Sequence, residues 1–493
     1  MDRMNVYITC NSTRAFRSTD VRPDRNPHRV DSKLNPLDEA HRRQLWLPFP
    51  RGEPTVLPND NDSDQIEVTV IGGGLAGMAA SIHLVRTGLR VLCIETDIAD
   101  TQPVGESLDW SAPDLLAAFG LSMDRLISEG IATWKRHVTL RLADGSTTHY
   151  VPGEWLGQPP FNLELRTLHV DRVELNAAIR NIAIADGVRF LQDRVTRIET
   201  EGRAVTSVIT EQGVRIASRW FIDASGSSAR LFPRTFNLPA SDYGPHKVAI
   251  WSYFTVSESI EGTTLHAEGS CPAYMDWVWE IPIHANTISI GYVSTGEAIK
   301  ALRATGHTTE SIFRTQLERF PRFRDLIQSS HIVSPSVTSY RCRVHSHIFG
   351  PNWLVAGEAA AMVDPMTSNG VTAALRHASE ASALIIKYRQ RARLPWLAAA
   401  MYSRRVQDVA RFFNCGIEKV VYDGPIRNRI GVKMAGDVYT IPAWSLNSVY
   451  ARVRPRGVIS SLLIGLLLGI FRAAASVMHS FCESEQAHCE AAG

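Results

Sequence analysis

The chain has 493 residues, of which 44% are hydrophobic and 21% are charged, a composition typical of a globular enzyme that excludes collagen, coiled coils and wholesale disorder. Its 52 basic and 50 acidic residues nearly cancel, so no strong positive field favours a phosphate backbone, and nucleic acid is not an expected partner. The seven cysteines form no CxxC pair or ligand-like cluster, which favours a reducing compartment and no structural metal.

The first part of the chain has no pattern of a folded domain. Residues 1–63 are rich in Arg, Asp, Asn and Pro and show no sustained periodicity apart from an apolar patch at residues 45–50. We expect a disordered extension, although a start codon chosen too far upstream would also explain it. The first twenty residues lack a basic start followed by an apolar stretch, so the predicted location is cytoplasmic.

A strand, a glycine-rich turn, a helix and a second strand follow from residue 66. The turn GGGLAG contains Gly72, Gly74 and Gly77 and separates an apolar strand from a helix that ends at Gly88. In this context the glycines allow a tight turn, close approach of the backbone to a pyrophosphate, and packing of helix against strand. Glu95 ends the second strand, where a carboxylate can accept hydrogen bonds from both ribose hydroxyls. The unit predicts a dinucleotide site.

The middle of the chain mixes helices and strands. We expect helices at 114–119 and 172–185 and a strand at 137–142. Three further segments alternate in the manner of strands and predict one mainly antiparallel sheet; they are residues 251–256, 276–283 and 287–293. The predicted organisation is a nucleotide-binding part at 64–240 with inserted segments, a substrate domain at 241–350, a return to the nucleotide fold at 351–385, and a helical region at 386–493.

The helical region contains an apolar segment at residues 457–471, preceded by Arg452, Arg454 and Arg456 and followed by Arg472. Fifteen uncharged residues are fewer than the roughly 20 that span a bilayer. The alternatives are a helix buried in the protein or between subunits, a helix lying in the membrane interface, and a true span. Peripheral membrane association through this segment is therefore one expectation.

Two later motifs decide which dinucleotide is expected. Asp223 to Gly226 follow an apolar strand, and a second motif at 352–375 lies between a strand and a helix. Together with Arg172, they resemble the flavin-contacting motifs of the FAD-dependent monooxygenase superfamily. The resemblance implies FAD and an α/β fold, with a Rossmann-like three-layer ββα domain, an inserted mainly antiparallel sheet and a helical C-terminal region. The cofactor-binding residues that we predict are Gly72, Gly74, Ala76, Gly77, Glu95, Gly105, Glu106, Ser107, Arg172, Asp223, Gly226, Gly357, Glu358, Asp364, Pro365 and Val371.

One position departs from the superfamily pattern. The usual Gly-Asp at the ribityl contact is Gly357-Glu358 in this chain. The longer acid could still reach a ribityl hydroxyl, or Asp364 could make that contact instead.

Within this superfamily the chain resembles the flavin-dependent halogenases. Gly105-Glu106-Ser107 is similar to a segment shared by halogenases and geranylgeranyl-reductase-like proteins. The stretch from Trp277 to Pro282 has the WxWxIP pattern associated with halogenases, and its two indoles are rigid bulk that can keep substrate away from the flavin. Lys135 lies about thirty residues after Ser107, where halogenases carry their essential lysine.

The resemblance also implies roles for individual residues. Lys135 would hydrogen-bond hypohalous acid or form a haloamine, because burial lowers the pKa of an amine. Ser368 would position the oxidant, and the backbone at Asn369 and Gly370 would hold chloride or bromide. Trp277 and Trp279 would exclude substrate from the flavin. A separate flavin reductase is expected, since no second GxGxxG occurs.

The substrate is expected to be an electron-rich aromatic compound. Thr367 lies where tryptophan halogenases have a glutamate, which argues against free tryptophan and for a phenolic, pyrrolic or carrier-bound ring. None of the 16 histidines stands out as the base that removes the ring proton.

Two other functions remain open from the sequence. An FAD-dependent monooxygenase or a geranylgeranyl-reductase-like enzyme acting on a lipidic or quinone-like substrate would share most of these motifs. A non-catalytic flavin-binding accessory protein would share the cofactor residues alone. Halogenation in secondary metabolite biosynthesis is the prediction, with substrate, halide and oligomeric state left open.

Overall fold

The computed structural model describes residues 65–96, 103–142, 147–151, 165–257, 260–267, 275–329, 335–422 and 466. The predicted disordered extension at 1–63 lies outside these residues, as does the apolar segment 457–471 except for residue 466. Among the described helices, none is both long enough and apolar enough to cross a bilayer.

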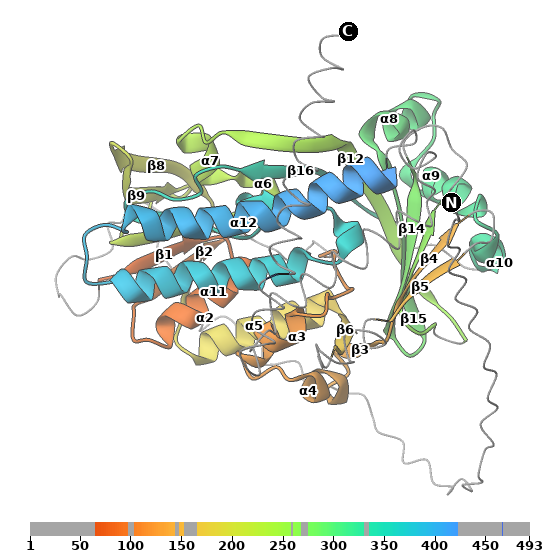
Figure 1. Ribbon diagram of the computed structural model, residues 1–493, viewed down its shortest axis with the longest axis horizontal. Coiled ribbons are helices and arrows are strands. Elements are labelled where there is room, and N and C mark those ends of the chain that lie inside the picture. The colour runs from red at the N-terminus through yellow and green to blue at the C-terminus, as the bar shows by residue number, and fades with distance from the viewer. Residues whose placement is uncertain are drawn as a thin grey trace, which may run out of the picture. The chain divides into compact units, whose positions relative to one another are not determined.

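A five-stranded parallel sheet forms the centre of the nucleotide-binding part (Figure 1). All of its strands except the edge strand at 189–192 are buried throughout, which explains their nearly continuous apolar sequences. In spatial order they are β17 (Trp353–Val355), β11 (Trp220–Asp223), β1 (Val68–Ile71), β2 (Val91–Glu95) and β7 (Arg189–Gln192). The predicted strand–turn–helix–strand unit is confirmed.

Helices cover one side of this sheet, where Figure 1 shows α2, α5 and α11 side by side with α12 next to α11. Helix α5 begins after Asp171, whose side chain accepts hydrogen bonds from the backbone N–H groups of Val173 and Glu174 and so caps its first turn. The bounds are α2 (Leu75–Val85), α5 (Arg172–Ala185), α11 (Gly370–Tyr388) and α12 (Trp396–Gly416), which continues as the π-helix η4 (Ile417–Tyr422).

A three-stranded antiparallel sheet shares the same hydrophobic core. Asn352, just before β17, joins it to the parallel sheet by exchanging two hydrogen bonds with the backbone of Val205. Its strands are β8 (Val195–Glu201), β9 (Ala204–Thr210) and β10 (Arg215–Ala217), and short helices follow at α6 (Gly226–Ala229) and α7 (Leu231–Thr235).

The second large sheet has eight strands, and its neighbours are antiparallel except for the parallel pair β13–β4. The prediction of a mainly antiparallel sheet is confirmed, but the sheet also takes β4 and β5, which precede the predicted substrate segment 241–350. In spatial order the strands are β18 (Ala361–Met362), β16 (Ser336–His345), β12 (Ala240–Thr255), β15 (Thr287–Thr295), β14 (Trp277–His284), β13 (Thr263–Ala267), β4 (Val138–Leu142) and β5 (Thr147–Tyr150).

Side-chain alternation gives this sheet two buried faces. One face, which includes Val278 and Ile290, packs under three helices, namely α8 (Gly296–Ala304), α9 (Thr309–Glu318) and α10 (Pro321–Ser329). The other face carries Trp277 and Trp279 in a separate buried cluster that includes Met366. Met366 belongs to the segment after β17, so this second face packs against the nucleotide-binding part.

A small two-stranded sheet lies near the junction of the two large ones. Strand β3 (Ala132–Lys135) pairs with β6 (Thr167–Val170), and Ser107 forms an isolated bridge to His169 beside them. Further short elements are α3 (Ala112–Ala117), α4 (Met123–Ser128), η2 (Gly357–Ala359) and η3 (Pro365–Thr367).

Candidate active site

The glycine turn after β1 leaves no room for side chains on its inner side. Gly72 has φ +106°, and an added Cβ there would lie 2.3 Å from the Ala224 carbonyl oxygen. An added Cβ at Gly77 would lie 1.7 Å from the Gly72 carbonyl oxygen, whereas one at Gly74 would meet nothing within 4 Å. Because Gly74 provides no side-chain cap for α2, the first N–H groups of this helix face an open position suited to a phosphate.

Glu95 lies at the end of β2 against this turn. It is 3% exposed, and an added Cβ at Gly73 would lie 1.9 Å from its Oε2. Arg180 forms an ion pair with Oε1, while Oε2 has no hydrogen-bond partner among the described residues. A buried acceptor aimed at a glycine cradle fits the ribose hydroxyls of the expected dinucleotide.

The later motifs meet the same turn. The backbone N–H of Ala356 donates to the Asp223 carbonyl (2.8 Å), and an added Cβ at Gly357 would lie 2.8 Å from the Cβ of Ala76. The buried carboxylate of Asp223 shapes its own loop by accepting hydrogen bonds from backbone N–H groups, including that of Phe232 (2.7 Å). These contacts bring the three predicted cofactor segments together.

The two acids considered for the ribityl contact have different surroundings. Glu358 is exposed and accepts a hydrogen bond from the Ser227 hydroxyl (2.9 Å). Asp364 is buried, and its carboxylate contacts Lys247 (3.1 Å) and accepts hydrogen bonds from Tyr422 (3.2 Å) and the Met366 backbone. Burial lowers the pKa of Lys247, but the adjacent carboxylates outweigh it, so its pKa lies above the usual value.

Around Asp364, Pro365 begins η3 and Val371 is buried in the first turn of α11. Both predicted cofactor residues therefore lie at the start of α11, on either side of Ser368. Gly226 has φ +78° at the start of α6, in the loop that Asp223 holds.

Arg172 holds the Gly-Glu-Ser segment at its N-terminal side. Its Nη1 donates to the carbonyl of Val104 (2.6 Å), and an added Cβ at Gly105, which has φ +105°, would lie 2.8 Å from that nitrogen. The next residue, Glu106, is buried and accepts a hydrogen bond from the Tyr253 hydroxyl (2.9 Å). Burial raises the pKa of Glu106 above its usual value.

Lys135 ends β3 with its amine inside the protein. Its side chain is 2% exposed, Nζ donates to the Leu108 carbonyl (2.7 Å) and lies 5.3 Å from the centre of the Trp110 ring. Burial lowers its pKa from 10.5 to about 7, and the charge of Asp109 opposes part of this effect. A substantial neutral fraction at neutral pH makes this amine a nucleophile.

The start of α11 is tied to the same segment. Ser368 adopts φ +56°, and its hydroxyl donates to Ser107 Oγ (3.1 Å). Asp109 accepts hydrogen bonds from Asn369 Nδ2 (2.8 Å) and the Thr372 hydroxyl (2.6 Å). The structure therefore brings Lys135 and Ser368 against consecutive residues, 108 and 107.

Gly370 is exposed and begins α11, next to buried Asn369. Thr367 is buried, and its hydroxyl donates to the Asp364 carbonyl (2.9 Å). A threonine hydroxyl held in this way has no basicity comparable to that of a carboxylate.

Sequence reasoning missed Asp109 as a site residue. Its carboxylate joins two segments about 260 positions apart, and it also accepts hydrogen bonds from the backbone N–H groups of Ser111 and Ala112. Its position two residues after Ser107 was the one available signal. The sequence also contains no indication that His169 lies beside Ser107.

The two tryptophans of the WxWxIP pattern are fixed by hydrogen bonds. Trp277 Nε1 donates to the Tyr422 hydroxyl (2.7 Å), and Trp279 Nε1 donates to Ser289 Oγ (3.0 Å). Their rings are 5.9 Å apart, and Gly291 makes room for Trp279, since an added Cβ would lie 2.0 Å from the indole. Both indoles are buried in one cluster with Trp110, the residue beside Lys135.

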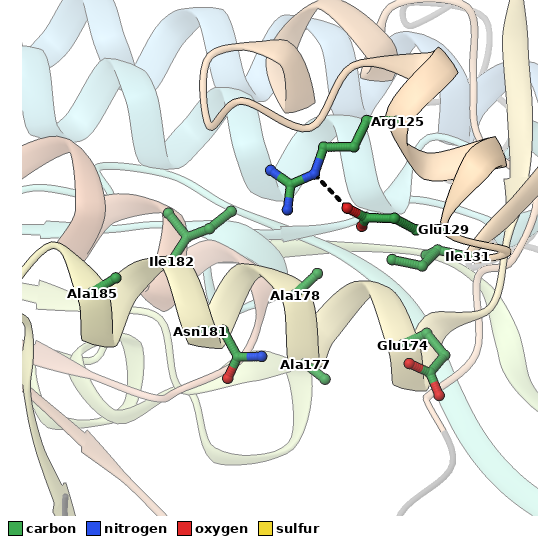
Figure 2. Close-up of a pocket in the computed structure, with 9 residues that line it drawn as sticks. All are labelled: Arg125, Glu129, Ile131, Glu174, Ala177, Ala178, Asn181, Ile182 and Ala185. Carbon is green, nitrogen blue, oxygen red and sulfur yellow. Dashed lines mark hydrogen bonds and ion pairs between the residues drawn. The ribbon is translucent and has the colours of Figure 1, made fainter. Parts of the chain in front are cut away.

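A hollow elsewhere on the surface can be distinguished from this site. Figure 2 shows it between α4 and α5, with the Arg125–Glu129 ion pair at its edge and small residues such as Ala178 along its floor. None of the predicted site residues lines it.

Comparisons with known proteins include flavin-dependent halogenases in both sequence and fold. A tryptophan halogenase family model matches residues 164–409, and a lycopene cyclase protein model matches residues 67–244. The chain is 26% identical over 341 residues to a tryptophan 2-halogenase of Chondromyces crocatus, covering 65% of this chain and 60% of that relative's length.

Two further relatives are an enzyme that acts on a carrier-bound ring and a brominase of known structure. A chlorinase of pyrrole-2-carbonyl groups on a peptidyl carrier protein, from Pseudomonas fluorescens, is 24% identical over 67% of this chain and 77% of its own length. A triple mutant of the flavin-dependent brominase Bmp2 superposes with a TM-score of 0.65 at 18% identity, covering 85% of this chain and 99% of that one. This likeness concerns the fold.

Proposed function

Because this chain belongs to the flavin-dependent halogenase family, we propose that it is an FAD-dependent oxidoreductase that uses reduced FAD, oxygen and halide to halogenate an electron-rich aromatic ring. One observation carries the proposal. The hydroxyl of Ser368 contacts Ser107, the last residue of the Gly-Glu-Ser segment, and the buried amine of Lys135 contacts Leu108, the residue that follows it. A nucleophilic amine and a helix start suited to an anion thus meet at one short segment of the chain.

The residues present fit FAD, the flavin that the family implies. The glycine turn at Gly72 and Gly77 and the N-terminus of α2 would hold the pyrophosphate, Glu95 the adenosine ribose, and the segments at Asp223 and Gly357 the rest of the cofactor. Bound reduced FAD supplies the electrons that activate oxygen for oxidation of the halide.

The residues of this chain would then control the oxidised halogen. Backbone N–H groups at Asn369 and Gly370, at the start of the 19-residue helix α11, would hold the halide. Lys135 would bind hypohalous acid or carry the halogen on its neutral amine. The rigid indoles of Trp277 and Trp279 would keep the aromatic substrate from the flavin.

The substrate that we propose is a phenolic, pyrrolic or carrier-bound ring. Thr367 lies where the tryptophan halogenases have a carboxylate, which removes a polar partner for free tryptophan. The pyrrole chlorinase relative acts on a carrier-bound ring, which supports the carrier-bound alternative. A separate reductase would supply reduced FAD. Peripheral membrane association through residues 457–471 remains a prediction outside the described part of the chain.

The test is mass spectrometry of products from purified protein, FAD and a flavin reductase with a panel of phenols and pyrroles. Reactions in bromide, chloride and halide-free buffer would compare wild type with Lys135→Met, which keeps the apolar stem and removes the amine. Arg136→Ala is the matched control, since its side chain is 64% exposed. We expect a halogen isotope pattern in wild type and Arg136→Ala and none in Lys135→Met.

Other products would contradict the proposal. A hydroxylated or reduced product that is indifferent to halide and to Lys135 would favour the monooxygenase or reductase alternative. Tight FAD binding without oxygen consumption by the reduced protein would favour the accessory-protein alternative.

A further inference from the structure

One face of the small β3–β6 sheet is polar, and three of its four side chains are buried. Lys135 is paired with Thr167 and Thr133 with His169, and because side chains alternate along a strand, these four lie on the same face. The alternate residues Leu168 and Val170 enter the main hydrophobic core. The polar face therefore points toward the Gly-Glu-Ser segment and β13.

A continuous chain of hydrogen bonds leads from this face to the start of α11. His169 Nε2 lies 2.9 Å from Thr263 Oγ1, and Thr263 Oγ1 lies 2.8 Å from Ser107 Oγ. Ser107 Oγ accepts the hydrogen bond from Ser368 (3.1 Å). His169, Thr263 and Ser107 are 0%, 2% and 6% exposed, so solvent does not interrupt the chain.

These hydrogen bonds can carry a proton toward His169 or away from it. A hydroxyl donates one hydrogen bond and accepts others, and the Ser107–Thr263 bond can run both ways. When the proton of the imidazole is on Nδ1, Nε2 accepts from Thr263, and every hydroxyl can donate toward His169. The Nδ1 atom itself has no hydrogen-bond partner among the described residues.

His169 is held in its neutral form. Burial lowers its pKa well below the usual value, and Lys135 and His137 act in the same direction. A weak base is sufficient to remove a proton from a ring carbon that has just gained a halogen. The proton on a ring carbon that has just gained a halogen is strongly acidic, because its loss restores aromaticity.

We propose that Ser368, Ser107, Thr263 and His169 form a proton relay that removes the ring proton displaced by the halogen. This inference rests on the proposed function. It assigns to His169 the role of the base at the end of the relay. Thr367 cannot take this role, because it has no carboxylate.

The step balances as follows. The ring uses an electron pair to form the carbon–halogen bond, and the carbon–hydrogen bond later breaks and returns its pair to the ring. The proton goes to Ser368 Oγ, whose own proton passes to Ser107. The proton of Ser107 passes to Thr263, and that of Thr263 to His169 Nε2. Each hydroxyl gains and loses one proton. Overall, the ring proton and the hydroxide left by hypohalous acid become one water molecule. When Lys135 carries the halogen, that hydroxide takes its proton from the amine, and the ring proton later restores the amine.

The experiment uses a ring-deuterated phenol or pyrrole that the wild-type protein halogenates. His169→Gln keeps a hydrogen-bonding amide near Nε2 but cannot accept a proton, and Thr263→Val removes the hydroxyl without changing the size of the side chain. We expect each variant to halogenate about 10²-fold more slowly, the lower end of general-base contributions. A primary isotope effect absent from wild type should appear, because proton removal becomes rate-limiting.

A double-mutant cycle tests whether the residues act as a unit. The His169→Gln/Thr263→Val protein should be no slower than either single variant, since coupled residues are non-additive. Thr263→Ser keeps the hydroxyl and should recover most of the rate. His266→Gln is the matched control, because His266 is equally buried but bonds to Glu280; it should show no isotope effect. FAD binding by each variant would establish that the protein is folded.

The outcomes separate the relay from the proposed function. If wild type halogenates and His169→Gln does so at the same rate without an isotope effect, or if the two losses multiply, the relay is wrong and the function stands. If wild type forms no halogenated product, the function is wrong and the relay with it.

Discussion

Replacing Lys135 by methionine should stabilise the protein, and by an amount that depends on pH. Burial lowers the Lys135 pKa from 10.5 to about 7, which at about 1.4 kcal/mol for each pH unit is a penalty of about 5 kcal/mol on the charged form. Methionine fills the same space without an amine to desolvate. Because the buried amine can relax or admit water, this figure is an upper bound.

The sign of the pH dependence follows from proton binding. Between pH 7 and 10 the unfolded chain binds a proton at Lys135 that the folded protein does not, so the stability of wild type rises with pH in this window. The Lys135→Met protein lacks this contribution. The difference in unfolding free energy between the two should therefore be small near pH 10 and grow by up to about 1.4 kcal/mol per pH unit as the pH falls to 7.

Urea denaturation of both proteins at several pH values would measure this difference. A difference that stays constant from pH 10 to pH 7 would refute the assignment of a low pKa to Lys135. The rate of halogenation gives an independent check, since a reaction that needs the neutral amine should speed up with pH through a midpoint near 7.

Three further predictions concern other parts of the site. Gly72→Ala should abolish FAD binding, measured by flavin absorbance after gel filtration, because its added Cβ meets the Ala224 backbone, whereas the exposed variant Arg136→Ala should retain it; equal binding by both would contradict the proposed cradle. Asp109→Ala should lower the free energy of unfolding by about 1–3 kcal/mol, since it leaves buried donors unsatisfied, and should also slow halogenation; an unchanged denaturation midpoint would show that its hydrogen bonds are dispensable. Trp279→Ala should yield hydroxylated product beside halogenated product, seen by mass spectrometry, if the indole separates substrate from flavin, and a product ratio equal to wild type would argue against that role.

Local chemistry explains which parts of the fold could be predicted. The glycine turn, the helix that starts after Asp171 and the alternating strand at Trp277 each have their cause within a few residues of sequence. The pairing of β4 with β13 could not be predicted in the same way, because strand periodicity identifies a strand but not its partner. This long-range pairing adds β4 and β5 to the second sheet.

The same distinction applies to the site. Lys135 and Arg136 are adjacent basic residues, and the structure separates them, because Lys135 is buried at the end of β3 and Arg136 is exposed just beyond it. Asp109 and His169 each form hydrogen bonds to residues 94 or more positions away, in addition to the local ones of Asp109. A single sequence does not identify the partners in such long-range contacts, which depend on how distant segments pack.

Halide exchange tests the central claim most directly. The same aromatic substrate would be turned over in bromide and then in chloride by wild type, Arg136→Ala and Lys135→Met, and the product masses compared. The proposed function predicts that the product mass changes with the halide for the first two proteins and that Lys135→Met forms no halogenated product. A product of the same mass in both buffers, formed equally by all three proteins, would contradict it.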